Sequence, residues 1–95
     1  MLRATAGELL AQMRQTGIVK VLVDARAQPA PLATVDAYNL WVELAPHMPR
    51  GTKMAVLVTW DLQGYTFGET VAVNRGVNVR NFNREDAALA WLLDR

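Results

Sequence analysis

The sequence predicts a small α/β domain in which helices and strands alternate in the order αβαβαβα. The chain has 95 residues, of which 52% are hydrophobic, and this is enough for one buried core. Residues 18–23 and 53–60 are almost continuously apolar and rich in β-branched side chains, as is typical of strands covered on both faces. Apolar residues recur at helical spacing in the segments that flank these runs. Strand–helix–strand units form parallel pairs with right-handed crossovers, so we expect residues 1–95 to form a single domain with a small, mainly parallel sheet flanked by helices.

The first helix is predicted from a start signal, an apolar stripe and a stop signal. Thr5 and Glu8 have the spacing of a capping box, in which the two side chains satisfy early backbone N–H groups. Apolar residues follow at helical spacing between Leu9 and Met13. Gly17 supplies the left-handed conformation that commonly ends a helix.

The second helix follows the strand at residues 18–23 after a proline-containing loop at residues 25–33. We expect it to begin with Thr34 as its N-cap and to run to Ala45, where Pro46 stops it. Its apolar residues share one helical face: Ala37, Leu40, Trp41, Leu44 and Ala45. This face predicts a helix that packs against the sheet.

A further strand, helix, strand and helix complete the predicted order. The strand at residues 53–60 is followed by a second capping box at residues 66–69, and Gly76 is the expected stop of the helix that begins there. A strand at residues 77–82 comes next, and Asn83 is the expected N-cap of the last helix. The apolar residues of that helix are Leu89, Trp91, Leu92 and Leu93.

A sheet of three strands would be narrow, because sheets usually have about four to six. The edges of such apolar strands are normally paired or covered, since an open edge invites association with another chain. We therefore expect either that a strand pair belonging at the N-terminus is absent or that a second subunit covers the edge. Both possibilities predict self-association or a partner, and the alternative is that helices alone cover the edge.

Composition and charge exclude several classes of function. The 10 basic and 9 acidic residues leave a formal charge of +1, which provides no strong field for nucleic acid or an anionic membrane. The chain has no cysteine, which excludes disulfides, thiolate catalysis and zinc–thiolate sites. Neither a secretory leader nor a membrane-spanning run is recognised, so we expect a cytoplasmic protein without membrane insertion.

The sequence contains none of the common catalytic patterns. A nucleophile elbow, a P-loop and a dinucleotide-binding glycine pattern are all missing, so we expect neither an enzyme nor a bound cofactor. The single histidine, His47, lies between prolines and is interpreted as an exposed loop residue. Residues 74–84 contain Arg75, Arg80 and Arg84, which could contact phosphates or RNA bases. Because these arginines are spread over a turn, a strand and a helix start, we interpret them as a solvated surface and expect no nucleic-acid partner.

Polar residues at the carboxyl ends of the predicted strands are further candidates, because ligands of open α/β sheets bind at that edge. They include Arg26, Gln63, Asn81 and Asn83, together with Asp24 and Asp61, which end the two apolar strands. Two neighbouring carboxylates could hold Mg²⁺, but aspartate is also a common turn residue, and we favour the turn interpretation without a metal. The three tryptophans are interpreted as core residues, with the lining of an apolar pocket as the alternative.

Several segments along the chain form a recognisable set: residues 21–24, 34–38, 54–58, 69–72, 74–76, 79–82 and 87–92, together with Phe67. These segments resemble the anti-sigma-factor-antagonist-like branch of the STAS superfamily, which includes bacterial proteins described as STAS-like or CRAL-TRIO-like. The resemblance covers nearly the whole chain. It implies a mixed sheet flanked by helices, with a strand pair ahead of the first helix that the sequence does not show.

The resemblance also implies a phosphorylatable serine at the start of the helix after the second buried strand. Thr34, within residues 32–36, occupies the matching place. The Asp-Ser pair and the glycine of the family's motif are missing there, so we interpret Thr34 as an N-cap and keep a phosphoacceptor as the alternative.

The residues and the resemblance together predict a non-enzymatic STAS-like module that binds a protein partner or a second copy of itself. Its expected surface is the start of the helix at Thr34 with the adjoining loop. The candidate residues for partner binding or phosphorylation are Thr34, Asp36, Asp24 and Asp61. The alternative is a CRAL-TRIO-like binder of a small apolar ligand or lipid, with Trp41, Trp60 or Phe67 near a pocket.

Overall fold

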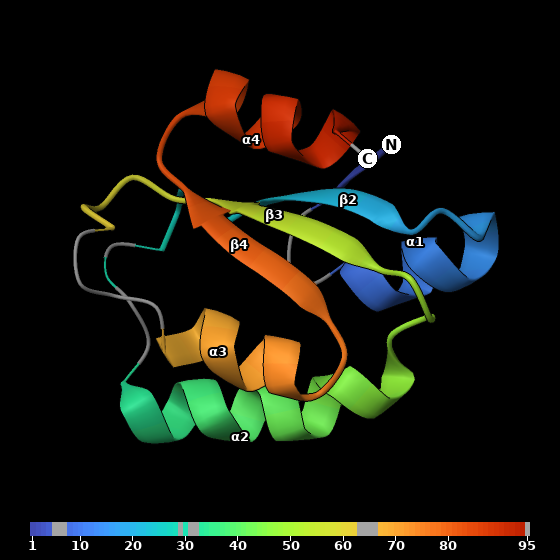
Figure 1. Ribbon diagram of the computed structural model, residues 1–95, viewed down its shortest axis with the longest axis horizontal. Helices are drawn as coiled ribbons and strands as arrows, with labels where there is room; N and C mark the ends of the chain where they lie inside the picture. The colour runs from blue at the N-terminus through green and yellow to red at the C-terminus, as the bar shows by residue number, and fades with distance from the viewer. Residues whose placement is uncertain (5–7, 29, 31–32, 63–66, 95) are drawn as a thin grey trace.

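A computed structural model describes residues 1–4, 8–28, 30, 33–62 and 67–94, and within them it shows an α/β fold built on a four-stranded parallel sheet (Figure 1). The elements are β1 Leu2–Ala4, α1 Leu9–Thr16, β2 Lys20–Asp24, α2 Thr34–Leu44, a 3₁₀ helix Ala45–His47, β3 Lys53–Leu57, α3 Phe67–Asn74, β4 Asn78–Phe82 and α4 Glu85–Leu93. The predicted fold class, a small parallel α/β sheet flanked by helices, is confirmed. None of the described helices is long and apolar enough to cross a membrane.

The chain begins with a strand, which the predicted order αβαβαβα omits. β1 pairs in parallel with β2, with Leu2 opposite Val21 and Ala4 opposite Val23. This strand covers the edge of β2 that a three-stranded sheet would leave open, so the prediction of three strands is wrong. The pairings of β2 with β3 and of β3 with β4 are also parallel, and the described sheet therefore differs from the mixed sheet that the resemblance implies.

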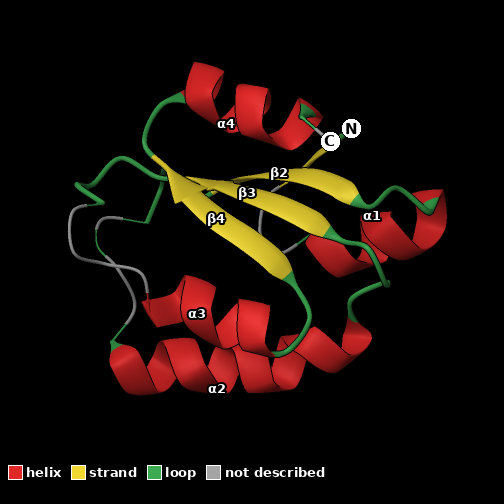
Figure 2. Ribbon diagram, viewed as in Figure 1, coloured by secondary structure: helices red, strands yellow, loops and turns green. Residues whose placement is uncertain are grey.

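The strand order explains how the helices are distributed over the two faces of the sheet. The strands lie side by side in chain order, β1-β2-β3-β4. Right-handed crossovers between successive neighbours place every crossover helix on the same face. α1, α2 and α3 therefore share one face, and α4, which follows the last strand, covers the other (Figure 2).

The buried core consists of one apolar cluster on each face. Along β2, Val21 and Val23 face the three crossover helices and Leu22 faces α4, which explains why this strand reads as a continuous apolar run. On the crossover face, α1 contributes Met13 and α2 contributes Trp41, so the predicted core position of Trp41 is confirmed. The cluster under α4 is smaller and consists of Leu22, Ala55, Leu57, Ala88 and Leu92.

Two predicted helix caps are wrong by one residue. The N-cap of α2 is Ala33, because its carbonyl already accepts the first helical hydrogen bond, from the N–H of Ala37 at 2.9 Å, so Thr34 is the first helical residue. The N-cap of α4 is likewise Arg84 and not Asn83, since the Arg84 carbonyl accepts the N–H of Ala88 at 3.1 Å.

The glycine stops of two helices are confirmed, whereas the end of β3 differs from the prediction. Gly17 and Gly76 have the positive φ angles, 70° and 85°, that end α1 and α3 as predicted. β3 ends at Leu57, three residues before the predicted end, and α2 ends at Leu44. Thr5 and Thr66, the hydroxyl members of the two predicted capping boxes, lie outside the described residues.

Candidate functional site

Two ion pairs lie near the carboxyl ends of β1 and β2 and the start of α4. Asp24, the last residue of β2, accepts hydrogen bonds from the backbone N–H, Nε and Nη2 of Arg26 at 3.2, 3.0 and 2.7 Å. Arg3 of β1 forms an ion pair with Glu85 in the first turn of α4. The aspartate is thus a turn residue that binds the backbone two residues later, which confirms the turn interpretation of Asp24.

Hydrogen bonds from the Arg26 side chain and backbone lower the pKa of Asp24 to about 2, and the positive charge of Arg3 contributes a smaller part. Asp61 is exposed in the segment that follows β3. Among the described residues, no three histidine, aspartate or glutamate side chains are grouped so that they could hold a metal ion. The hydrogen bonds between Arg26 and Asp24 hold the loop after β2 against the end of that strand.

Replacing Arg26 should return the acid titration of Asp24 towards the ordinary aspartate value. We expect the Asp24 carboxyl carbon to titrate near pH 2 in the parent protein and at a higher pH in Arg26→Gln, still below the ordinary aspartate value because the backbone N–H of residue 26 continues to donate, measured by carbon-13 NMR. Because the folded-state pKa is the lower one, the stabilisation from this contact is present above pH 4 and is lost as the pH falls towards 2. Arg14→Gln, at an exposed position on α1, is the control, and equal Asp24 midpoints in both variants would contradict the assignment.

The remaining sequence candidates lie at the start of α2. Thr34 opens the helix, and Asp36 is exposed in its first turn, where the helix dipole favours an acid. They therefore belong to a different element from Asp24 and Asp61, which lie at the end of β2 and beyond the end of β3. Gln63 and the side chain of Phe67 are outside what the structure describes.

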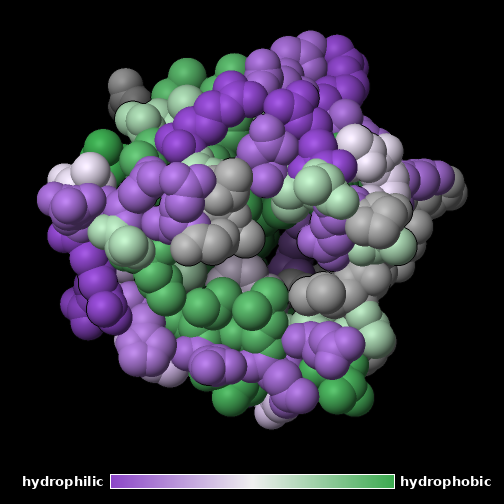
Figure 3. Space-filling view, turned by 180° about the vertical axis from the view of Figure 1, so that it is seen from behind, coloured by the Kyte–Doolittle hydropathy of each residue, from purple (hydrophilic) through white to green (hydrophobic). Residues whose placement is uncertain are grey.

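α2 has an exposed apolar side as well as a buried one. Ala37, Trp41 and Ala45 face the core, as predicted. Val35, Tyr38 and Val42 follow one another at helical spacing on an outer flank, with exposed fractions of 69%, 45% and 39%; these three residues are called the α2 stripe below. Figure 3 shows hydrophobic side chains in the lower part of the molecule, the side on which α2 lies. The predicted core residue Leu40 is 38% exposed on the opposite flank.

The α2 stripe continues onto the end of α3 through Arg75. The guanidinium carbon of Arg75 lies 5.2 Å from the centre of the Tyr38 ring, and Nη2 donates a hydrogen bond to the Tyr38 hydroxyl at 3.3 Å. The other two arginines of the segment lie against other side chains: Arg80 is 5.6 Å from the Phe82 ring centre, and Arg84 pairs with Asp86 at 2.6 Å. His47 is exposed in the 3₁₀ helix, as predicted for an exposed loop residue.

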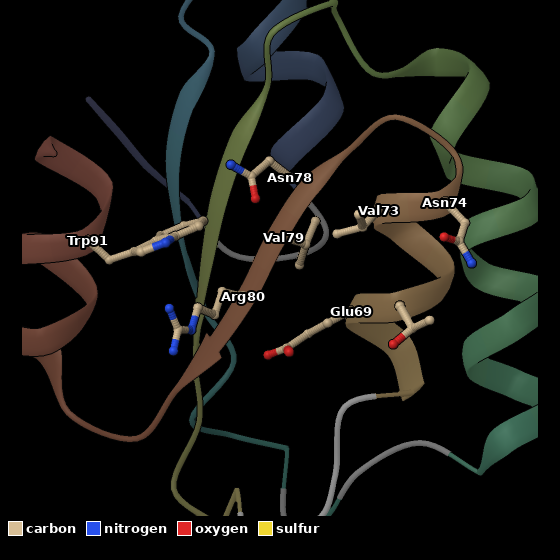
Figure 4. Close-up of a pocket in the computed structure, with 8 residues that line it drawn as sticks. Glu69, Val73, Asn74, Asn78, Val79, Arg80 and Trp91 are labelled. Atoms are coloured by element: carbon tan, nitrogen blue, oxygen red, sulfur yellow. The ribbon is translucent and has the colours of Figure 1, made fainter. Parts of the chain in front are cut away.

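A pocket of about 370 Å³ lies along the outer edge of β4, between α3 and α4 (Figure 4). Glu69, Thr70, Val73 and Asn74 of α3 form one wall. Asn78, Val79 and Arg80 of β4 form the floor, and Trp91 of α4 stands on the opposite side. Neither Trp41 nor Trp60 lines it, and five of its eight described lining residues have polar side chains. Sequence reasoning missed this pocket because nothing local to residues 78–82 indicates that their strand lies at an edge.

A scan against protein-family models, a search of curated proteins and a search of solved structures each found no match to the chain. The support for a function therefore comes from the exposed surface of the molecule itself.

Proposed function

We propose that the chain is a non-enzymatic protein-interaction module, of the STAS-like type that its sequence resembles, and that it forms a homodimer through α2 in the cytoplasm. The observation that carries this proposal is the α2 stripe: three large apolar side chains, Val35, Tyr38 and Val42, stand exposed on one flank of a single helix. The site includes the start of α2, where Thr34 and Asp36 lie.

A helix on the outside of a domain normally buries its apolar residues and shows polar ones. In α2 the polar residues are confined to a narrow band of Asp36, Asn39 and Glu43, and large apolar residues flank that band on both sides. Contiguous exposed apolar surface of this kind marks protein-interaction sites.

The spacing of the α2 stripe supports a second copy as the partner. In an isologous dimer, two antiparallel α2 helices would bring Val35 of one copy towards Val42 of the other, with Tyr38 near the two-fold axis. Arg75, which lies over the Tyr38 ring, would then lie at the edge of the interface. The stripe is self-complementary in this arrangement, as an isologous interface requires.

The apolar-ligand alternative has less support. Five of the eight described residues that line the pocket at β4 have polar side chains, whereas sites for apolar ligands are lined mostly by hydrophobic ones. Trp41, one of the expected pocket residues, is only 8% exposed and packs in the core.

Sedimentation equilibrium over a range of concentrations tests the dimer. We expect the parent chain to show a monomer–dimer equilibrium, and Val42→Asp to raise the dimer Kd by about 30-fold or more, because an unpaired charge in an interface costs about 2 kcal/mol or more. Asn39→Asp adds the same charge to the polar band and should leave the Kd nearly unchanged. A parent chain that stays monomeric at millimolar concentration, or a dimer that tolerates Val42→Asp, would refute the proposal.

A further inference from the structure

The outer edge of β4 presents backbone groups to the pocket. The N–H of Val58, just after β3, donates to the carbonyl of Phe82 at 2.8 Å, so Phe82 directs its backbone groups towards β3. Alternate residues of a strand direct their backbone groups to opposite sides. Val79 and Asn81 therefore direct their N–H and carbonyl groups outwards, away from the sheet.

One of these outward donors is already occupied. The carboxylate of Glu69, on α3, accepts the N–H of Asn81 at 2.7 Å, as the carbonyl of a neighbouring strand would. Within the described part of the chain, no hydrogen bond takes the N–H of Val79, which forms the floor of the pocket. Glu69 thus occupies the outward N–H of Asn81 on the edge of β4. Val79 remains the position at which another strand could pair.

The two walls of the pocket carry opposite charges. On the α4 side, Arg80 and Trp91 line the pocket, and the Lys53 ammonium lies 4.6 Å from the centre of the Trp91 ring. On the α3 side, Glu69 provides a carboxylate and Val73 an aliphatic side chain that is 54% exposed. Figure 4 shows Arg80 and Trp91 on one side of β4, and Glu69 and Val73 on the other.

We propose that this groove, which we call the β4 groove (Glu69, Val73, Val79, Arg80 and Trp91), binds an extended peptide segment of another protein as an added strand. Successive side chains of such a segment point to opposite walls. Acidic side chains therefore face Arg80, and aliphatic side chains face Val73, while the Glu69 carboxylate repels an acid on its own side. The ligand is thus an extended segment in which acidic and aliphatic residues alternate.

This proposal goes beyond the α2 dimer and does not depend on it, because the two surfaces lie on different elements. The competing role for the Glu69 contact is protection of an edge strand, in which a charged side chain only prevents pairing with other chains. The experiment below separates the two, since a protected edge binds neither peptide.

The test uses the ¹⁵N-labelled full chain and two synthetic probes, acetyl-Val-Glu-Val-Glu-Val-Glu-amide and its counterpart with lysine in place of glutamate. We expect the amide signals of Val79 and Arg80 and the indole signal of Trp91 to move with the glutamate peptide, which should bind about tenfold more tightly than the lysine peptide. No movement of these signals at millimolar peptide, or equal affinities for the two probes, would overturn the proposal.

Charge reversal sharpens the same experiment. Arg80→Glu should reverse the preference, so that the lysine peptide becomes the tighter ligand, and the undisturbed signals elsewhere report that the fold is intact. Arg84→Glu makes the same change at an exposed arginine outside the pocket and should keep the glutamate preference. If Arg80→Glu keeps the parent preference, the peptide does not occupy the β4 groove. Sedimentation of the same samples reports on the α2 dimer separately.

Discussion

Leu92→Ala should destabilise the domain by about 2–5 kcal/mol, one of the two largest effects that we expect from a single substitution. Leu92 is 0% exposed and lies in the small cluster under α4 with Leu22, Ala55, Leu57 and Ala88. Among the described residues, α4 is the one helix on this face of the sheet, so no neighbouring helix can move in to fill the space. Domains of this size are stable by about 5–15 kcal/mol in total, so the loss is a large fraction of the whole.

Urea-induced unfolding, followed by far-ultraviolet circular dichroism, measures this effect. The matched control is Leu93→Ala on the same helix, because Leu93 is 62% exposed and its truncation should change the free energy of unfolding by less than about 0.5 kcal/mol. Equal unfolding midpoints for the two variants would show that α4 is not docked through Leu92.

Ala4→Asp should cost about 3–5 kcal/mol, because it places an unpaired carboxylate in the core. Ala4 is 6% exposed, lies opposite Val23 in the β1–β2 pair and belongs to the cluster on the crossover face. The substitution therefore tests β1, the strand that the sequence prediction omits. A chain in which residues 2–4 were not paired with β2 would tolerate the change.

Met1→Asp provides the control for this experiment. Met1 is 51% exposed and precedes β1, so the same new charge remains in water there and should leave the urea midpoint nearly unchanged. Equal urea midpoints for Ala4→Asp and Met1→Asp would show that residues 2–4 are not paired with β2.

The elements that the sequence predicts correctly are those whose signals are local. Gly17 and Gly76 end helices because only a residue without a Cβ adopts a positive φ at low cost. β2 and β3 are recognisable from their apolar, β-branched residues, and the turn role of Asp24 depends on a residue two positions away. The N-caps at Ala33 and Arg84 were missed because neither side chain has the polar acceptor that a sequence pattern can recognise.

Local sequence signals do not predict β1, the α2 stripe or the β4 groove. Leu2, Arg3 and Ala4 are too few to show an alternating pattern, and they form a strand only because β2 offers an edge to pair with. Arg3 fits there because Glu85 lies nearby, although the two are far apart in the chain.

The sequence by itself determined the α/β class, the parallel pairing and most of the helix stops, because these depend on short-range periodicity and backbone preference. The tertiary structure alone decided which strands lie at the edges of the sheet, and it left the α2 stripe and the β4 groove facing outwards. Both outcomes depend on where a helix or strand finds its neighbours, and those neighbours are set by packing between distant segments of the chain. The surfaces proposed to bind partners are therefore properties of the assembled fold and not of any one segment of the sequence.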